Sequence, residues 1–139
     1  SDDFLSRITE LPGGTETILL AEDEPSVRAM AARVLRRCGY TVLEAEDGDS
    51  ALHAASEHAG PIHLLLTDVN MPTMDGRELA DRLLPTRPNM KTLFISGSSP
   101  DDIEQRGVAN RNALLLKKPF TSVPLAQKVR EILDSGSVS

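Results

Sequence analysis

Aromatic residues and cysteine are scarce in this 139-residue sequence. Aromatic side chains make up 3% of the chain, so the core has to be aliphatic, and apolar residues reach 40%. Cys38 is the only cysteine. It therefore forms no internal disulfide, which favours a reduced, cytoplasmic setting with Cys38 as a small core residue. The length fits one domain, and such a domain buries about two-thirds of its unfolded surface.

Positive charge and long apolar runs are also lacking. The formal net charge is −6, from 15 basic and 21 acidic residues. Nucleic acid and anionic membranes need a basic footprint, so this balance disfavours both as partners. No apolar run approaches the ~20 residues of a membrane helix, and no signal segment opens the chain. We therefore expect a soluble domain that contacts neither nucleic acid nor membrane.

Apolar runs of strand length recur along the chain. Four of them are TILLA at 17–21, IHLLLT at 62–67, TLFIS at 92–96 and ALLLK at 113–117. Such runs, bounded by turn residues, are typical of strands buried on both faces of a parallel sheet. The more mixed segment TVLEA at 41–45 suits an edge strand.

Segments with helical periodicity alternate with these strands. One runs from Val27 to Cys38, with Pro25 in its first turn and Gly39 at its exit. Further helices are predicted near 51–55, 79–84 and 125–133, the last with Pro124 in its opening turn, and one with few apolar residues at 99–110. This alternation predicts an α/β fold, a doubly wound five-stranded parallel sheet of order 2-1-3-4-5 with helices on both faces. We assign 1–15 to a lead-in or linker, 16–134 to the domain and 135–139 to a tail.

Polar residues close four of the apolar runs. Glu22 and Asp23 follow the first run, and Asp68 and Lys118 follow the runs that end at 67 and 117. Ser96 is the last residue of the run at 92–96. Any one polar strand end is ordinary, because strand ends meet water. The carboxyl ends of parallel strands lie side by side, however, so these side chains are expected to converge on one site.

The converging residue types form a chemical set. Clustered carboxylates disfavour one another's ionisation, so either one takes a proton or a cation binds, and carboxylate oxygens suit Mg²⁺. The Ser96 hydroxyl and the Lys118 ammonium both donate to anionic oxygens. Together these groups predict a site for a phosphoryl group.

Four segments resemble the receiver domains of two-component response regulators. They are ILLAEDEPSVR at 18–28, LLLTDVNMPTMDGREL at 64–79, LFISGSS at 93–99 and LLLKKPF at 114–120. The resemblance implies a CheY-like, flavodoxin-like domain that accepts a phosphoryl group from a phosphohistidine onto an aspartate. The opening ETILLAEDEPSVR most resembles receivers attached to hybrid sensor histidine kinases.

The resemblance also implies a role for each site residue. Asp68 matches the phosphoacceptor, Asp23 the direct Mg²⁺ ligand and Glu22 the residue that holds a metal-bound water. Further positions are the backbone carbonyl of Asn70 as a metal ligand, Ser96 as the switch hydroxyl, Lys118 as the lysine before the proline, and Gly76 as the turn glycine. Pro119 holds Lys118 extended and allows a cis peptide bond. Lys117 has the opposite strand parity and is expected to be solvated.

Two positions depart from the common pattern of the family. Glu22 stands where many members have aspartate, a change that we expect to preserve metal binding. Leu115 stands where many members have an aromatic switch residue. We therefore expect the phosphorylated state to be communicated without an aromatic rotamer, either through weaker coupling or through displacement of the backbone after Gly97.

Other functions are weighed against this one. A metal-dependent phosphohydrolase commonly needs a second acid or base near the nucleophile, and Asn70 cannot serve. A pseudo-receiver, used only for protein interaction, is expected to lack the phosphoacceptor or the lysine, and both are present. His53, His58 and His63 are read as packed or solvated, and the charged face of the last helix (Lys128, Arg130 and Glu131) as solvated. The expected partner is a histidine kinase or histidine phosphotransfer domain, in cis or in trans, with the kinase, signal, output and oligomeric state left open.

Overall fold

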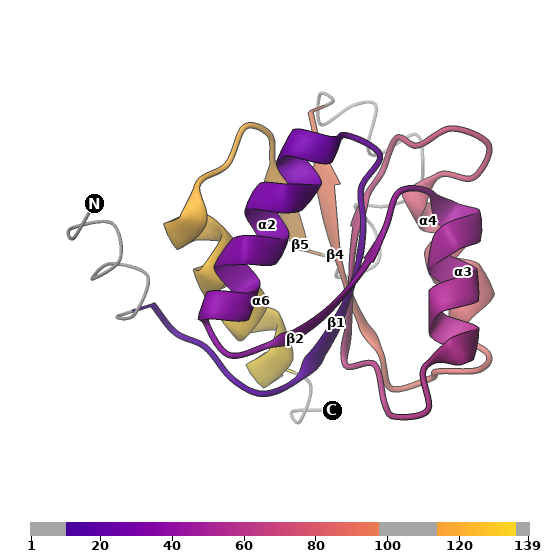
Figure 1. Ribbon diagram of the computed structural model, residues 1–139, viewed down its shortest axis with the longest axis horizontal. Coiled ribbons are helices and arrows are strands. Elements are labelled where there is room, and N and C mark those ends of the chain that lie inside the picture. The colour runs from indigo at the N-terminus through magenta and orange to yellow at the C-terminus, as the bar shows by residue number, and fades with distance from the viewer. Residues whose placement is uncertain (1–10, 98–113, 136–139) are drawn as a thin grey trace.

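The computed structural model describes residues 11–97 and 114–135, and its centre is a parallel sheet (Figure 1). The sheet order is β2-β1-β3-β4-β5, as predicted. The five strands are β1 (Thr17–Ala21), β2 (Thr41–Ala45), β3 (Leu64–Asp68), β4 (Lys91–Ser96) and β5 (Leu114–Lys117).

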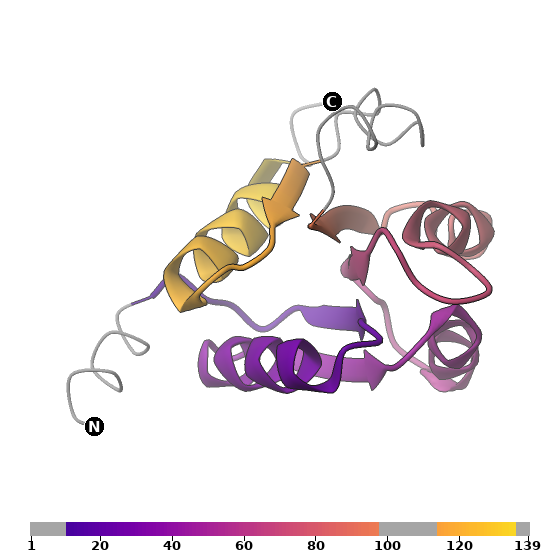
Figure 2. The same cartoon turned by 90° about the horizontal axis from the view of Figure 1, so that it is seen from above.

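Helices cover both faces of this sheet. The described helices are α2 (Pro25–Arg37), α3 (Gly48–Glu57), α4 (Gly76–Leu83) and α6 (Ser122–Ser135). Seen from above, α2 and α6 lie on one face, and α3 and α4 on the other (Figure 2). The doubly wound α/β prediction is confirmed, while the helix predicted at 99–110 lies outside the described residues.

The alternation of side chains along the strands divides the core in two. Ile18 and Leu20 of β1 join the cluster under α2 and α6, whereas Leu19 joins the cluster under α3 and α4. Every residue of β3 is buried, which explains its unbroken apolar run. Both layers are built mainly from aliphatic side chains, as the low aromatic content required, and among the described residues Tyr40 is the one aromatic residue in the buried cluster under α2 and α6.

Helix α2 begins and ends as its sequence predicts. Pro25 occupies the first turn, where its missing N–H costs nothing. Gly39 has a φ of 105°, in the left-handed region that favours glycine, and lets the chain turn directly into β2. The helix carries Arg36 and Arg37 in its last turn, where positive charge complements the helix dipole.

Strand β3 is displaced by two residues from the predicted 62–67 at its start and by one at its end. The turn around Gly60 and Pro61 delays its beginning to Leu64, and its last residue is Asp68. His63 lies just before the strand, where its Nδ1 accepts a hydrogen bond of 2.9 Å from the Thr17 N–H. A packed role for this histidine, one of the two readings in the sequence, is therefore confirmed.

One charged residue of the last helix is not solvated as predicted. Arg130 is about one-fifth exposed and pairs with Glu16, with Nη2 2.7 Å from Oε2. Its Nη1 also donates to the Gly13 carbonyl at 3.0 Å. The Arg130 hydrogen bond holds the pKa of Glu16 below its usual value. We call this contact the Arg130 anchor. Helical periodicity does not reveal it, because its partners lie more than a hundred positions away.

The predicted lead-in contacts the rest of the chain near its end. The Gly14 N–H donates to the Cys38 carbonyl at 3.2 Å, just after α2. Cys38 is half-buried against the α2–α6 core, and burial raises the pKa of its thiol. At the other end of the chain, Ser135 still belongs to α6.

The helices are too short or too polar to cross a membrane. This finding applies to residues 11–97 and 114–135, the part of the chain that was searched.

Candidate functional site

Three carboxylates meet at the carboxyl end of the sheet. Glu22 and Asp23 directly follow β1, and Asp68 ends its neighbour β3. Each offers one oxygen atom, and these three atoms lie within 4.8 Å of one another. Glu22 and Asp68 are buried whereas Asp23 is exposed, so the group opens to solvent on one side. Convergence of these residues was predicted from the order of the strands.

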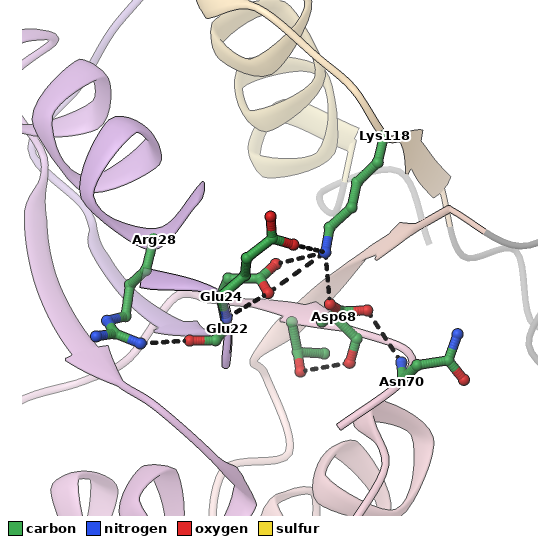
Figure 3. Close-up of polar contacts among 7 residues, drawn as sticks. Glu22, Glu24, Arg28, Asp68, Asn70 and Lys118 are labelled. Carbon is green, nitrogen blue, oxygen red and sulfur yellow. Dashed lines mark hydrogen bonds and ion pairs between the residues drawn. The ribbon is translucent and has the colours of Figure 1, made fainter. Parts of the chain in front are cut away.

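The ammonium of Lys118 lies among carboxylates (Figure 3). Its Nζ is 2.8 Å from Oδ2 of Asp68 and 3.2 Å from Oε1 of Glu22. It also lies 3.5 Å from Oε1 of Glu24. A single lysine therefore balances much of the negative charge of the site.

Burial and charge shift the ionisation of these groups in opposite directions. Burial, with a contribution from the neighbouring Asp68 carboxylate, raises the pKa of Glu22 to about 7. Burial opposes the charge of Lys118, but its contacts with Asp68 and Glu22 outweigh that effect and raise its pKa above the usual range. The lysine therefore stays charged, and the carboxylates favour a cation beside them.

Backbone groups fix the orientation of the acidic side chains. The Asn70 N–H donates to Oδ1 of Asp68 at 3.0 Å, which leaves Oδ2 facing Lys118 (Figure 3). The Glu24 N–H donates to Oε2 of Glu22 at 3.0 Å. The side chain of Arg28, one turn into α2, adds a hydrogen bond of 2.7 Å from its Nη1 to the Glu22 carbonyl. Both acids are therefore held before any ligand arrives.

The loop after β3 packs closely against the end of that strand. A Cβ atom at Gly76 would overlap the carbonyl oxygen of Asp68, so this turn requires glycine. Asp75 caps α4 by accepting a hydrogen bond of 2.8 Å from the Glu78 N–H. Within the loop, Thr73 has a φ of 64°, and the Met74 N–H reaches the Pro72 carbonyl at 2.7 Å. Thr73 thus occupies a strained three-residue turn.

Ser96 and Lys118 come from the two strands on the far side of Asp68. Ser96 is 2% exposed at the end of β4, and its carbonyl accepts a hydrogen bond of 2.9 Å from the Lys118 N–H. Lys117 is exposed, as its strand parity predicted, while the side chain of Lys118 turns into the site. The Lys118–Pro119 peptide bond is cis, which the sequence allowed.

Leu115 occupies the position where an aromatic residue is common. It is half-buried and packs against the pair formed by Val69 and Phe94. Phe94 lies in β4 two residues before Ser96. An aliphatic side chain thus links β5 to the strand that carries the hydroxyl.

Glu24 is the site residue that sequence reasoning missed. The signal was the third acid in the run Glu22-Asp23-Glu24, which follows β1 without interruption. Only the folded chain shows that the Glu24 side chain returns toward Lys118, ninety-four positions away.

The donor set suits a hard divalent cation. Three carboxylates around one small volume provide the oxygen ligands that Mg²⁺ prefers, with room for water on the exposed Asp23 side. A cation there would offset the burial and the Asp68 repulsion that together raise the pKa of Glu22. The described residues therefore fit a divalent metal site beside an ammonium group.

Comparison with known proteins identifies the class of this fold and site. The family model for the response regulator receiver domain matches residues 18–130. The chain belongs to this family and is a receiver domain of two-component signalling.

Relatives at similar identity differ in length. The chain is 38% identical over 130 residues to the sensor kinase CckA of Brucella abortus, covering 94% of this chain and 14% of that kinase. It is 38% identical over 116 residues to the receiver protein CpdR of the same organism, covering 84% of this chain and 95% of CpdR. The chain thus spans about a seventh of one relative and nearly all of the other.

Solved structures confirm the CheY-like fold. The receiver domain of the hybrid histidine kinase CckA superposes with a TM-score of 0.71 at 40% identity, covering 84% of this chain and 98% of that one. Chemotaxis protein CheY4 of Vibrio cholerae gives a TM-score of 0.74 at 28% identity, with coverages of 86% and 99%.

Proposed function

We propose that Asp68 is the phosphoacceptor of this receiver domain. The observation that carries the proposal is the position of its Oδ2, 2.8 Å from Nζ of Lys118 and grouped with Glu22 and Asp23. In the proposed step, a carboxylate oxygen of Asp68 attacks the phosphorus of a phosphohistidine. An O–P bond forms, the N–P bond breaks, and the imidazole leaves with the electron pair and takes a proton.

Other residues of the site have proposed roles in binding the metal and the phosphoryl group. Glu22, Asp23, Asp68 and the Asn70 carbonyl are the proposed holders of Mg²⁺, which when bound neutralises charge on the phosphoryl oxygens. Lys118 donates to those oxygens through its ammonium group. Ser96 is the proposed hydroxyl donor, and its movement shifts a two-state equilibrium in the adjoining backbone.

The proposed partner is a histidine kinase or a histidine phosphotransfer domain. Attachment in cis is supported by the likeness to CckA, and action in trans by the likeness to the receiver protein CpdR, 95% of which the match covers. Transfer rather than repeated turnover is proposed, because the residue two positions after Asp68 is Asn70, which cannot act as a general base. The domain boundaries 16–134 and the cytoplasmic setting stay predictions.

Intact mass spectrometry tests the phosphoacceptor. The protein is incubated with acetyl phosphate and Mg²⁺, with and without a chelator, beside the Asp68→Asn variant and the matched control Asp49→Asn in α3. We expect a phosphate adduct in the wild type and the control, and none in Asp68→Asn or in the chelated sample. An adduct retained by Asp68→Asn would refute the assignment, and no adduct in any sample would favour a pseudo-receiver.

The rate of repeated turnover distinguishes a phosphoacceptor from a phosphohydrolase. Inorganic phosphate is measured over time at a large excess of donor. Release that stays slow while the adduct accumulates fits a receiver, whereas fast release without an adduct fits a phosphohydrolase.

A further inference from the structure

We propose that Glu24 is a positioning residue that acts through Lys118 and slows phosphorylation of the domain by anionic donors. The inference rests on the proposed function of Asp68 and extends it to a residue that takes no part in bond making. Its basis is that the ammonium of Lys118 has three carboxylate neighbours, and only two of them belong to the buried acidic pair.

The three carboxylates around Lys118 play different parts in the proposed phosphorylation. In the proposed function Asp68 becomes an acyl phosphate, and Glu22 belongs to the group that would hold Mg²⁺. The Glu24 side chain is 56% exposed at the edge of the site and belongs to neither group. Its contact of 3.5 Å with Nζ is therefore separate from the atoms that would bond to phosphorus or to a metal.

Through this contact, Glu24 competes with the phosphoryl group for the ammonium of Lys118. An ammonium has three N–H donors, and each donor given to Glu24 is lost to the phosphoryl oxygens. The same carboxylate also repels an incoming anion, an effect that falls as salt screens the charge. Both effects act in one direction, so removal of the charge should speed phosphorylation.

The backbone of Glu24 has a separate task that the proposal leaves intact. Its N–H donates a hydrogen bond of 3.0 Å to Oε2 of Glu22, and this bond does not involve the Glu24 side chain. Glu24→Gln keeps this hydrogen bond and the shape of the side chain while removing its charge. Glu57→Gln is the matched control, because Glu57 is exposed and ends α3 near the amino ends of the strands, away from the acidic side chains.

The test measures phosphorylation rates against donor concentration at low and high salt. With dianionic acetyl phosphate at low salt, Glu24→Gln should react about threefold faster than wild type, as expected when one nearby like charge is removed. The gain should be smaller with monoanionic phosphoramidate and should shrink in high salt, while Glu57→Gln matches wild type. A rate equal to or below wild type in Glu24→Gln would overturn the proposal, since it would mean that Glu24 has no effect or assists Lys118.

A second readout does not depend on phosphorylation. The NH₃⁺ signal of Lys118 is recorded by NMR in the metal-free protein, where Glu24→Gln should shift it and Glu57→Gln should not. An unchanged Lys118 signal in Glu24→Gln would overturn the proposed contact. Failure of the wild type to form any adduct would instead overturn the role of Asp68, so the two failures are distinguishable.

Discussion

Lys118 and Asp68, fifty positions apart in sequence, form an ion pair of 2.8 Å at the carboxyl ends of two strands that β4 separates. Asp68 thus belongs both to this pair and to the group of three carboxylates with Glu22 and Asp23. Lys118, the proposed donor to the phosphoryl group, is therefore also placed to compete with any metal that uses Asp68.

This competition predicts an effect on metal binding. Lys118→Met should bind Mg²⁺ about tenfold more tightly than wild type, because a positive charge next to two of the carboxylates is removed. Phosphorylation of the variant should nevertheless be impaired, since the donor to the phosphoryl oxygens is lost. Calorimetric titration with Mg²⁺ measures the first effect, and Lys117→Met, at an exposed position, is the control. Equal changes in both variants would contradict the assignment of Lys118.

Close packing after β3 predicts a strong effect of a single methyl group. Gly76→Ala should lower the free energy of unfolding by about 2 kcal/mol or more, because its Cβ atom would overlap the Asp68 carbonyl. It should also weaken Mg²⁺ binding by displacing Asp68. Gly60→Ala is the control, since the nearest atom to its added Cβ, Nε2 of His58, lies at 3.4 Å. Urea denaturation of both variants measures the free energy of unfolding. A loss of stability in Gly60→Ala as large as that in Gly76→Ala would contradict the prediction.

The strained turn predicts a stabilising substitution. Thr73→Gly should raise the free energy of unfolding by about 0.5 kcal/mol, because the left-handed conformation costs a residue with a Cβ about 1–2 kcal/mol and the freer unfolded chain offsets part of the gain. Thermal and urea unfolding measure it. The same replacement at Thr41, exposed in β2, should be destabilising. A lower stability in Thr73→Gly would show that the threonine side chain stabilises the loop.

The Arg130 anchor predicts a pH dependence of stability. Arg130 lowers the pKa of Glu16 in the folded state below its ordinary value of 4.5, so the anchor stabilises the protein above that pH and loses its effect as the pH falls through the lowered pKa. Glu16→Gln should therefore cost about 1 kcal/mol at pH 7 and progressively less below about pH 4.5. Urea denaturation across this range tests it. A cost that does not change with pH would mean that packing, not charge, explains the effect.

The sequence predicts the fold well because its main features are local or periodic. Continuous apolar runs locate the strands, and Pro25 and Gly39 bound α2. Strand order then brings Glu22, Asp23 and Asp68 together, since the carboxyl ends of neighbouring parallel strands share one edge. Each of these inferences needs only chain order and residue type.

Contacts made by long side chains were beyond that reasoning. Arg130 lies on a helix face that periodicity marks as polar, but its guanidinium reaches Glu16 and Gly13. Glu24 likewise looks like a solvated residue until the position of Lys118 is known. Rotamers and distant partners decide both cases, and neither leaves a pattern in the sequence.

The Arg130 anchor also gives the domain two poles. It joins the entrance of β1 to the last turns of α6, whereas the acidic group lies at the other end of β1, about 17 Å away for a five-residue strand. Thr17 at the start of β1 and Ser135 at the end of α6 therefore lie at one pole, and the carboxylate of Asp68 lies at the other. The proposed phosphoacceptor is thus separated by the length of the sheet from the two ends of the described chain.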